Sequence, residues 1–415
     1  MSPSKIEIGA DGGFHDFPDL PPFPSDVPIA PLLQLSLKRL QDGDTEESAR
    51  FIRAAKDLGF FYLDLRNSME GETILKDTDR LFKLGEDLFQ LDLEEKQSYD
   101  FSRQGTYYGC VGCQLAVFSL FLIHENRYKG FGQSIVDNKG TTDRNEFYNV
   151  SKDDILSPKP ILPSPTILIQ SRPLLKSFVH SAHTITRLLL GHLTQHLHLP
   201  DHTLESLHRL DAVSGDQVRF LKAPPQKKDD SRTALGEHTD FGSITVLFNR
   251  LGGLQVKLPP GIDALDGLSE NNEKRYEERS SKRPNDPWAF VRPLPFHAII
   301  NLGDALTKFS AGIFRSNIHR VVAAPGLQAT HTKFSVVYFA RPEDDVVLKR
   351  LVERKVEKAR GEGRGEDVWE VNDEEEEMTS KEWILKRALG RRVGLGDVIK
   401  GERDAAGLPK GLGDT

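Results

Sequence analysis

The feature that most constrains this chain is a pair of potential metal ligands, His238 and Asp240, followed far along the sequence by His319. Two imidazoles and one carboxylate can occupy one face of an octahedral metal ion and leave the opposite face open. In an extended strand residues i and i+2 point to the same side, so we expect His238 and Asp240 to reach one ion. The third ligand must come from a distant segment, which requires a fold that brings separate strands together.

Several stretches around these residues have the composition of β-strands. Residues 241–248 and 334–339 are rich in β-branched and aromatic side chains. A hairpin is expected between residues 254–257 and 288–291, interrupted by a charged surface loop from Asp263 to Pro287. A sheet folded into a barrel would bring these strands to one mouth, so the sequence predicts a barrel around the site.

Helices are expected to brace this barrel from outside. The run from Asp44 to Leu58 is amphipathic, Asp44 with Glu47 resembles a capping box, and Gly59 ends the run. Further elements are expected as a strand at 60–63 and as helices from Thr73 to about Leu91 and from Pro173 to about Leu199.

The third of these helices carries His192 and His196 at the i, i+4 spacing that can bind zinc. A metalloprotease would need glutamate directly after the first histidine, and Leu193 stands there. We therefore interpret the histidines of this helix as part of a solvated face.

Composition excludes some partners. The chain has 415 residues, 38% of them hydrophobic, a net charge of −7 and a pI of about 6.0. Without a global positive field, nucleic acid is not an expected partner. The sequence has no cleavable signal pattern and no apolar run long enough to span a bilayer, so we expect no membrane association and a soluble, cytoplasmic, monomeric protein.

The two cysteines, Cys110 and Cys113, form a C-x-x-C motif that lacks the further ligands of a zinc site and the βαβ context of a redox motif. They lie in an unusual segment, 110–127, with an apolar centre. Our hypothesis is that this segment is a late insertion, for instance a translated intron. The alternative is a buried helix or strand.

Four segments carry a family resemblance, and they occur in this order: 236–242 (GEHTDFG), 301–306 (NLGDAL), 314–321 (FRSNIHRV) and 333–339 (KFSVVYF). Their order and residues closely resemble those of the isopenicillin N synthase-like family of Fe(II)/2-oxoglutarate dioxygenases. The resemblance extends from about Pro28 to about Arg341. The resemblance implies a mixed α+β fold with a double-stranded β-helix, or jelly-roll barrel, braced by N-terminal and central helices. The regions expected on this basis are an irregular N-terminal arm (1–27), an N-terminal dioxygenase region with the atypical insert (28–165), the barrel with its bracing helix (166–345), and a charged C-terminal tail with a short helix near Ser380 to Leu389 (346–415).

The same resemblance implies an oxidoreductase in which His238, Asp240 and His319 bind Fe(II) and form the catalytic centre. It further implies 2-oxoglutarate as cosubstrate, dioxygen, and ascorbate as a candidate reductant. The expected reaction is hydroxylation or desaturation of a small organic molecule, such as a specialised metabolite, with release of succinate and carbon dioxide.

Members of the family usually hold the distal carboxylate of 2-oxoglutarate with an Arg-x-Ser triplet, and this chain has Lys333-Phe334-Ser335 at that place. Lysine keeps the positive charge but loses the bidentate fork. An exposed strand lysine is the alternative for Lys333. The family's upstream tyrosine is replaced by Ala223, and Lys222 is a candidate to compensate for it.

Other residues near these motifs have expected roles of their own. Asn301, Gly303 and Asp304 are interpreted as a structural turn. Alternation along a strand points Arg320 away from the metal, toward a nearby carboxylate. Thr245 and Phe241 are expected either to line the pocket or to pack against it.

Three alternatives stay open at this point. The first is an Fe(II) oxidase of the same fold that does not use 2-oxoglutarate, which the Lys333 and Ala223 departures motivate. The second is a catalytically inactive barrel that acts as a binding protein. The third is a zinc hydrolase with the same three ligands, although the sequence offers no evident general base beside them.

Overall fold

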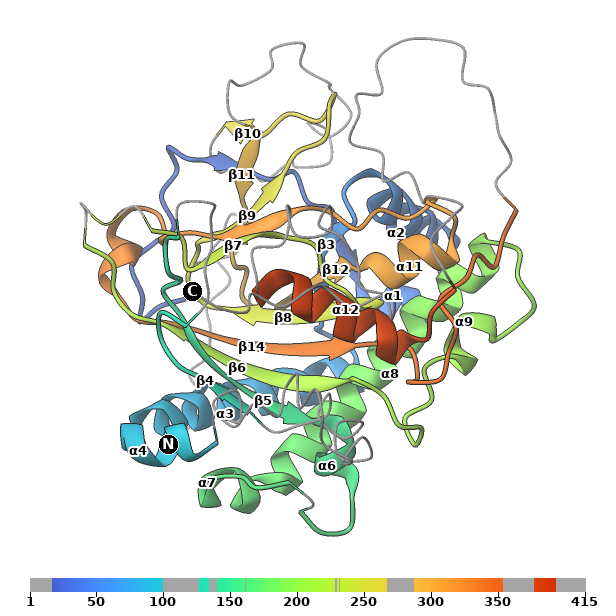
Figure 1. Cartoon of the computed structure of the whole chain (residues 1–415). Coiled ribbons are helices and arrows are strands. Elements are labelled where there is room, and N and C mark those ends of the chain that lie inside the picture. Colours follow the sequence, from blue (N-terminus) through green and yellow to red (C-terminus); the bar gives the residue numbers. More distant parts are fainter. Residues whose placement is uncertain are drawn as a thin grey trace, which may run out of the picture.

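Two facing β-sheets form the centre of the molecule in the computed structural model, and helices cover the outer face of the larger sheet (Figure 1). The structure describes residues 17–99, 127–133, 140–160, 162–227, 230, 232–266, 287–353 and 377–392. The strands are β1 (Pro28–Ile29), β2 (Gln34–Ser36), β3 (Phe60–Asp64), β4 (Arg127–Lys129), β5 (Glu146–Ser151), β6 (Gln217–Ala223), β7 (Leu235–His238), β8 (Ile244–Asn249), β9 (Leu254–Lys257), β10 (Leu265–Asp266), β11 (Trp288–Phe290), β12 (His297–Leu302), β13 (His319–Val321) and β14 (Lys333–Ala340). The helices are α1 (Leu37–Gln41), α2 (Thr45–Asp57), α3 (Met69–Gln90), α4 (Leu93–Ser98), α6 (Lys152–Leu156), α7 (Thr166–Gln170), α8 (Arg172–His196), α9 (Thr203–Ser206), α11 (Asp304–Phe309), the 3-10 helix η3 (Gly326–Thr330) and α12 (Ser380–Arg392).

The strand order mixes distant parts of the chain. The larger sheet runs β2-β3-β12-β8-β14-β6-β5-β4, and the smaller runs β10-β1-β11-β9-β13-β7. The β2/β3 and β1/β11 pairs are parallel, and the other pairs are antiparallel. The predicted hairpin is present as the antiparallel pair β9/β11, and both predicted strands after Asp240 and at 334–339 are present as β8 and β14.

Each face of the larger sheet has its own hydrophobic cluster, because successive strand residues point to opposite sides. The inner cluster lies between the sheets and joins Phe60 and Ile299 to Val256 of the smaller sheet. The outer cluster packs residues such as Phe220 and Val336 against α3 and α8. The sheet therefore separates a smaller apolar cluster between the two sheets from a larger helix-covered core.

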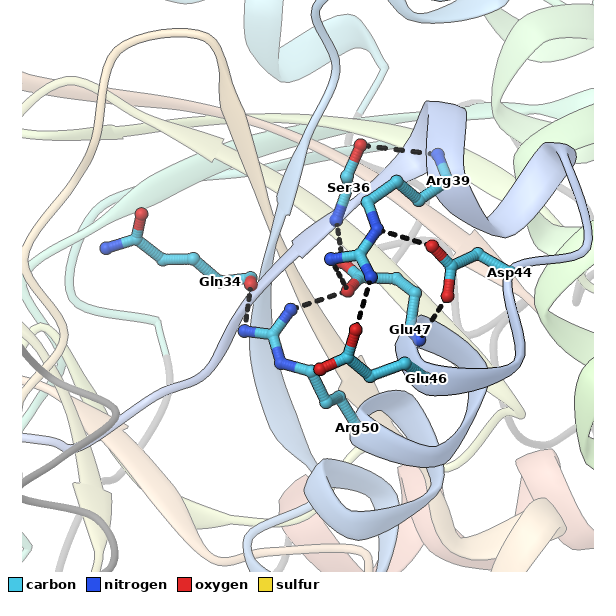
Figure 2. Close-up of polar contacts among 7 residues, drawn as sticks. All are labelled: Gln34, Ser36, Arg39, Asp44, Glu46, Glu47 and Arg50. Atoms are coloured by element: carbon cyan, nitrogen blue, oxygen red, sulfur yellow. Dashed lines mark hydrogen bonds and ion pairs between the residues drawn. The ribbon is translucent and has the colours of Figure 1, made fainter.

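Helix α2 begins at the predicted cap, but the predicted reciprocal capping box does not form. The Oδ1 atom of Asp44 accepts from the Glu47 amide at 3.1 Å, while the Glu47 carboxylate accepts from the Ser36 amide instead of turning back to Asp44. Figure 2 shows this buried carboxylate between Arg39 and Arg50, with nitrogen to oxygen distances of 2.9 and 2.5 Å. Glu47 thus ties α2 to the segment around β2, because a buried carboxylate is stable only when paired.

The prediction of a solvated histidine face on α8 was wrong for His192. This side chain is buried; its Nδ1 lies 2.9 Å from Ser48 Oγ and its Nε2 3.1 Å from Leu40 O. His183 is also buried, and its Nε2 lies 2.8 Å from His208 O. Both polar rings are tolerated inside because hydrogen bonds replace their lost contacts with water.

Helix boundaries differ from the predictions by a few residues. Helix α3 begins at Met69 rather than Thr73, since Ser68 Oγ accepts from the Gly71 amide and caps an earlier turn. Helix α8 ends at His196, before the predicted Leu199. Helix α12 covers the predicted C-terminal helix and extends to Arg392.

Some predictions fall on residues that the structure does not describe. Cys110 and Cys113, with all of the 110–127 segment except Arg127, lie outside the described residues, as does most of the charged loop at 263–287. No helix in the described part of the chain combines the length and apolar character that crossing a bilayer requires.

Candidate metal centre

His238 and His319 meet across two neighbouring strands. The antiparallel pair β7/β13 places them directly opposite each other, and their ring centroids are 4.1 Å apart. A register irregularity follows between His319 and Val321. Phe60 packs edge-on against the His319 ring at 5.3 Å between centroids, so the inner hydrophobic cluster supports one side of the pair.

Asp240 joins the two histidines, although not by the route predicted. Strand β7 ends at His238, so Thr239 and Asp240 lie at the start of the short turn that leads to β8, and the expected alternation along one strand does not extend to Asp240. The Asp240 Oδ1 atom nevertheless lies 3.8 Å from His319 Nε2 and 4.0 Å from His238 Nε2. Ligand atoms of all three residues lie within 4.8 Å of one another.

The other oxygen of Asp240 is held by two side chains. Thr245 Oγ1 donates to Asp240 Oδ2 at 2.6 Å, and Asn301 Nδ2 donates to the same oxygen at 2.8 Å. The Asp304 amide donates to the Asp240 carbonyl at 2.8 Å and fixes the turn itself. These contacts leave Oδ1 directed toward the histidines.

The hydrogen bonds of the two imidazoles determine their tautomers. His238 Nδ1 lies 2.7 Å from Gly236 O, and His319 Nδ1 lies 3.1 Å from Asn317 O. A carbonyl oxygen only accepts, so each Nδ1 carries a proton and each neutral ring keeps its Nε2 lone pair. Orientation of a ligand histidine by a backbone carbonyl is the usual arrangement in metal sites.

The electrostatic environment keeps the Asp240 carboxylate ionised. Burial alone would raise the pKa of this carboxyl group. The neighbouring imidazoles, in their protonated form, and the hydrogen bonds from Thr245 and Asn301 outweigh burial, so the pKa of Asp240 lies well below its usual value. Two nitrogen donors and one anionic oxygen around one point fit a divalent metal of the two-histidine, one-carboxylate type.

Lys333 is buried, which rules out the alternative of an exposed strand lysine. It is 5% exposed, and its amine makes no hydrogen bond or ion pair to the part of the chain that the structure describes. Burial lowers its pKa from 10.5 to about 7. A carboxylate beside this amine would restore its charged form, because an opposite charge favours ionisation.

Ser335 lies on the same face of β14 as Lys333, two residues away. Its hydroxyl donates to Asn249 Oδ1 at 2.6 Å. Lys222 lies on the other face: it is paired with Phe334 in the sheet, and its Nζ contacts Glu146 at 2.9 Å and faces the Phe89 ring of α3. The suggestion that Lys222 replaces the missing tyrosine was therefore wrong.

The structural turn predicted at 301–304 is only partly correct. Asn301 belongs to strand β12 and contacts the candidate ligand Asp240. Gly303 does mark a close approach, since a Cβ atom there would lie 2.2 Å from Gly242 O. The sequence did contain a signal for the role of Asn301: it is a polar residue at a buried strand position, and such a group needs a specific hydrogen-bond partner.

Arg320 points away from the candidate ligands, as predicted. Its Nε donates to Gln255 Oε1 at 2.8 Å, its guanidinium covers the Trp288 ring at 4.1 Å, and Nη1 lies 3.8 Å from Glu237 Oε1. The carboxylate of Glu237 is exposed, so this long ion pair contributes little.

Comparisons with known proteins agree with this geometry. The model of the 2OG-Fe(II) oxygenase superfamily matches residues 215–342, which include all three candidate ligands. The chain is 31% identical over 331 residues to the 2-oxoglutarate-dependent dioxygenase frbH of Dothideomycetidae sp. (strain 11243), covering 80% of this chain and 88% of that protein. It is 30% identical to a 2-oxoglutarate-dependent dioxygenase of Aspergillus fumigatus, covering 80% of each chain.

Solved structures are similar in fold. The crystal structure of a full-length Neurospora crassa protein in complex with alpha-KG has a TM-score of 0.59 at 18% identity, with 86% of this chain and 95% of that chain covered. A 2OG-Fe(II) oxygenase family protein from Caulobacter crescentus has a TM-score of 0.58 at 19% identity, with 86% of this chain and 98% of that chain covered. The jelly-roll architecture expected from the sequence is thereby confirmed.

Proposed function

The chain belongs to the 2OG-Fe(II) oxygenase superfamily, and from this premise we propose that His238, Asp240 and His319 are its iron ligands. It is an Fe(II)- and 2-oxoglutarate-dependent oxygenase. The observation that supports the ligand assignment is the convergence of two Nε2 lone pairs and Asp240 Oδ1 on one point. When bound, Fe(II) would allow dioxygen to oxidise the substrate while 2-oxoglutarate is converted into succinate and carbon dioxide.

We propose that Lys333 pairs with the distal carboxylate of 2-oxoglutarate. A buried ammonium without a protein partner in the described residues is costly, and a carboxylate of the cosubstrate would supply the missing charge. The Ser335 hydroxyl has a single proton, which Asn249 now accepts. Ser335 would assist only by turning that proton toward the carboxylate, in which case the Asn249 amide can donate to Ser335.

Small organic molecules are the substrates we propose, with specialised metabolism as their setting. The pairing of β2 and β3 with the barrel strands supports residues 28–165 and 166–345 as two regions of one catalytic unit. We further propose residues 1–27 as an N-terminal arm and residues 346–415 as a charged C-terminal tail with a short helix. A cytoplasmic monomer completes the proposal. Gel filtration with light scattering tests the monomer, and subcellular fractionation tests the location.

The buried Lys333 weakens the case for an oxidase that needs no cosubstrate, because that alternative leaves this amine without a role. The zinc hydrolase and the inactive barrel are likewise disfavoured by membership of the oxygenase superfamily. Metal analysis of the purified protein separates iron from zinc.

The deciding experiment is anaerobic titration of the Fe(II)-loaded protein with 2-oxoglutarate, followed through the weak visible charge-transfer band of the chelated oxo acid. We expect a band in the parent protein and a loss of 2-oxoglutarate affinity of at least tenfold in Lys333→Met. The matched control is Lys222→Met, which removes a lysine from the opposite face of the neighbouring strand and should keep the parent affinity. A parent protein that binds iron but gives no band would contradict the cosubstrate assignment.

A further inference from the structure

Helix α12, the red helix in Figure 1, is anchored to the segment that follows the barrel. The Ser380 amide donates to Val346 O at 2.7 Å, and the Lys381 amide donates to Asp344 O at 3.1 Å. Ser380 Oγ donates to Pro342 O at 3.0 Å. These bonds fix the start of the helix against residues 342–346, just after β14. The helix itself lies outside the residues that the family model matches.

From this anchor the helix contacts the turn that carries Asp240. The buried Trp383 donates from Nε1 to the carbonyl of Phe241, the residue after Asp240, at 3.2 Å. One turn later, Arg387 Nη2 donates to Thr239 Oγ1, in the residue before Asp240, at 3.0 Å. The helix therefore holds the turn on both sides of the candidate ligand.

Arg387 also neutralises a buried carboxylate. Its Nη2 lies 2.6 Å from Asp304 Oδ2, and Thr239 Oγ1 donates to the same oxygen at 3.0 Å. The Asp304 amide in turn donates to the Asp240 carbonyl. Asp304 is 5% exposed, so its charge requires a partner, and Arg387 supplies one.

We propose that Arg387 is a positioning residue of the metal centre and that α12 sets the geometry of the 238–242 turn. The inference rests on the proposed iron site. Arg387 acts through Thr239 and Asp304, which its guanidinium contacts directly, while the rings of Phe241 and Trp383 hold the guanidinium in place. Removal of its charge takes the cationic partner away from the buried Asp304 carboxylate and loosens the turn, so the three donor atoms no longer converge as well.

The test uses the full chain and compares the parent with Arg387→Met and Arg387→Lys. Fe(II) affinity is measured by anaerobic titration, and hydrogen exchange of residues 236–243 is measured in the metal-free protein. We expect Arg387→Met to bind Fe(II) about tenfold more weakly, at the lower end of the effect of outer-sphere substitutions. Exchange in 236–243 should accelerate, and Arg387→Lys should recover most of the affinity because an ammonium still pairs with Asp304.

Arg250→Met is the matched control. Arg250 pairs with Asp79 at the same 2.6 Å and covers the Phe82 ring at 4.3 Å, but it contacts helix α3 rather than the metal turn. We expect its Fe(II) affinity to stay within about twofold of the parent, since outer-sphere effects require contact with the ligands' own partners. An equal loss in Arg250→Met, or parent-like affinity in Arg387→Met, would overturn the proposal.

If Arg387→Met is not recovered as a folded protein, Thr239→Val takes its place. This change removes the hydroxyl that Arg387 contacts and leaves the Arg387–Asp304 ion pair intact, so unchanged exchange and Fe(II) affinity overturn the proposal. A parent protein that binds no Fe(II) overturns the proposed function as well. Parent binding with an unaffected Arg387→Met protein overturns only the role of α12.

Discussion

Asn301 Nδ2 donates to Asp240 Oδ2 at 2.8 Å, from a strand that lies beside β8 in the larger sheet. Thr245 donates to the same oxygen from β8. Two neighbouring strands thus fix the rotation of one carboxylate. Because the Oδ1 atom faces the two histidines, the orientation of Asp240 is set by the sheet rather than by its own turn alone.

Loss of either donor should weaken metal binding. We expect Asn301→Leu and Thr245→Val each to reduce Fe(II) affinity by about 10- to 100-fold, since outer-sphere partners orient the ligand. Anaerobic Fe(II) titration measures the change. Thr245→Ser keeps the hydroxyl and should restore affinity; if Thr245→Ser is as weak as Thr245→Val, packing rather than the hydrogen bond is responsible.

Removal of a ligand should abolish activity without unfolding the chain. We expect His238→Ala, Asp240→Ala and His319→Ala to lose bound iron and 2-oxoglutarate turnover while keeping the circular dichroism spectrum of the parent. His180→Ala, at an exposed position of α8, is the control and should retain both. Turnover by Asp240→Ala would refute the ligand assignment.

Binding of 2-oxoglutarate should depend on pH through Lys333. Burial lowers the pKa of this amine from 10.5 to about 7, so the protein without cosubstrate loses the positive charge as the pH rises through 7. We expect the Kd of 2-oxoglutarate to increase about tenfold per pH unit at most above that point. Titrations with 2-oxoglutarate above and below pH 7 measure this change in Kd. In Lys333→Arg the pH dependence of the Kd should vanish. A Kd that does not change with pH in the parent protein would contradict the prediction.

Buried histidines should make the fold sensitive to acid. Burial lowers the pKa of each of four side chains: His183, His192, His208 and His297. Below their unfolded pKa of about 6.5 the unfolded chain binds more protons than the native one, so stability present above this pH is lost as the pH falls toward the folded pKa values. We expect the Tm to fall between about pH 7 and 5, and His192→Gln to show a shallower fall than the parent. An unchanged slope in that variant would assign the acid sensitivity to other groups.

The hydrogen bonds of His192 should also contribute to stability at neutral pH. We expect His192→Leu to lower the free energy of unfolding by about 1–3 kcal/mol, since Ser48 Oγ loses its imidazole partner and Leu40 O loses the imidazole but keeps the Gly43 amide as a donor. Urea denaturation near neutral pH measures the change. His198→Leu, at a nearby position outside α8, is the comparison and should have a smaller effect.

Local patterns predicted much of this structure, and long-range contacts account for the errors. The cap of α2 and the strand composition of β8 and β14 are properties of short segments, and these predictions were confirmed. The solvated face assigned to His192 was wrong because its partners, Leu40 and Ser48, lie far away in the sequence. The face of Lys222 depends on the phase of strand pairing, which a single sequence does not reveal.

For the candidate site, too, local features could be predicted from the sequence and long-range contacts could not. The spacing of His238 and Asp240 could be recognised from the sequence, but its expected cause, alternation along one strand, is replaced by a turn after β7. The contacts of Asn301 and Arg387 could not be predicted, because each joins the Asp240 turn to a segment brought close only by the folded chain.

The two hydrophobic clusters on opposite faces of the larger sheet have a consequence for protein engineering. Side chains of the outer cluster hold the sheet to α3 and α8, whereas positions such as Leu221 and Val337 on the opposite face of the same strands do not contribute to that packing. A mutant library confined to inward-facing positions would reshape the interior and leave the helix contacts intact.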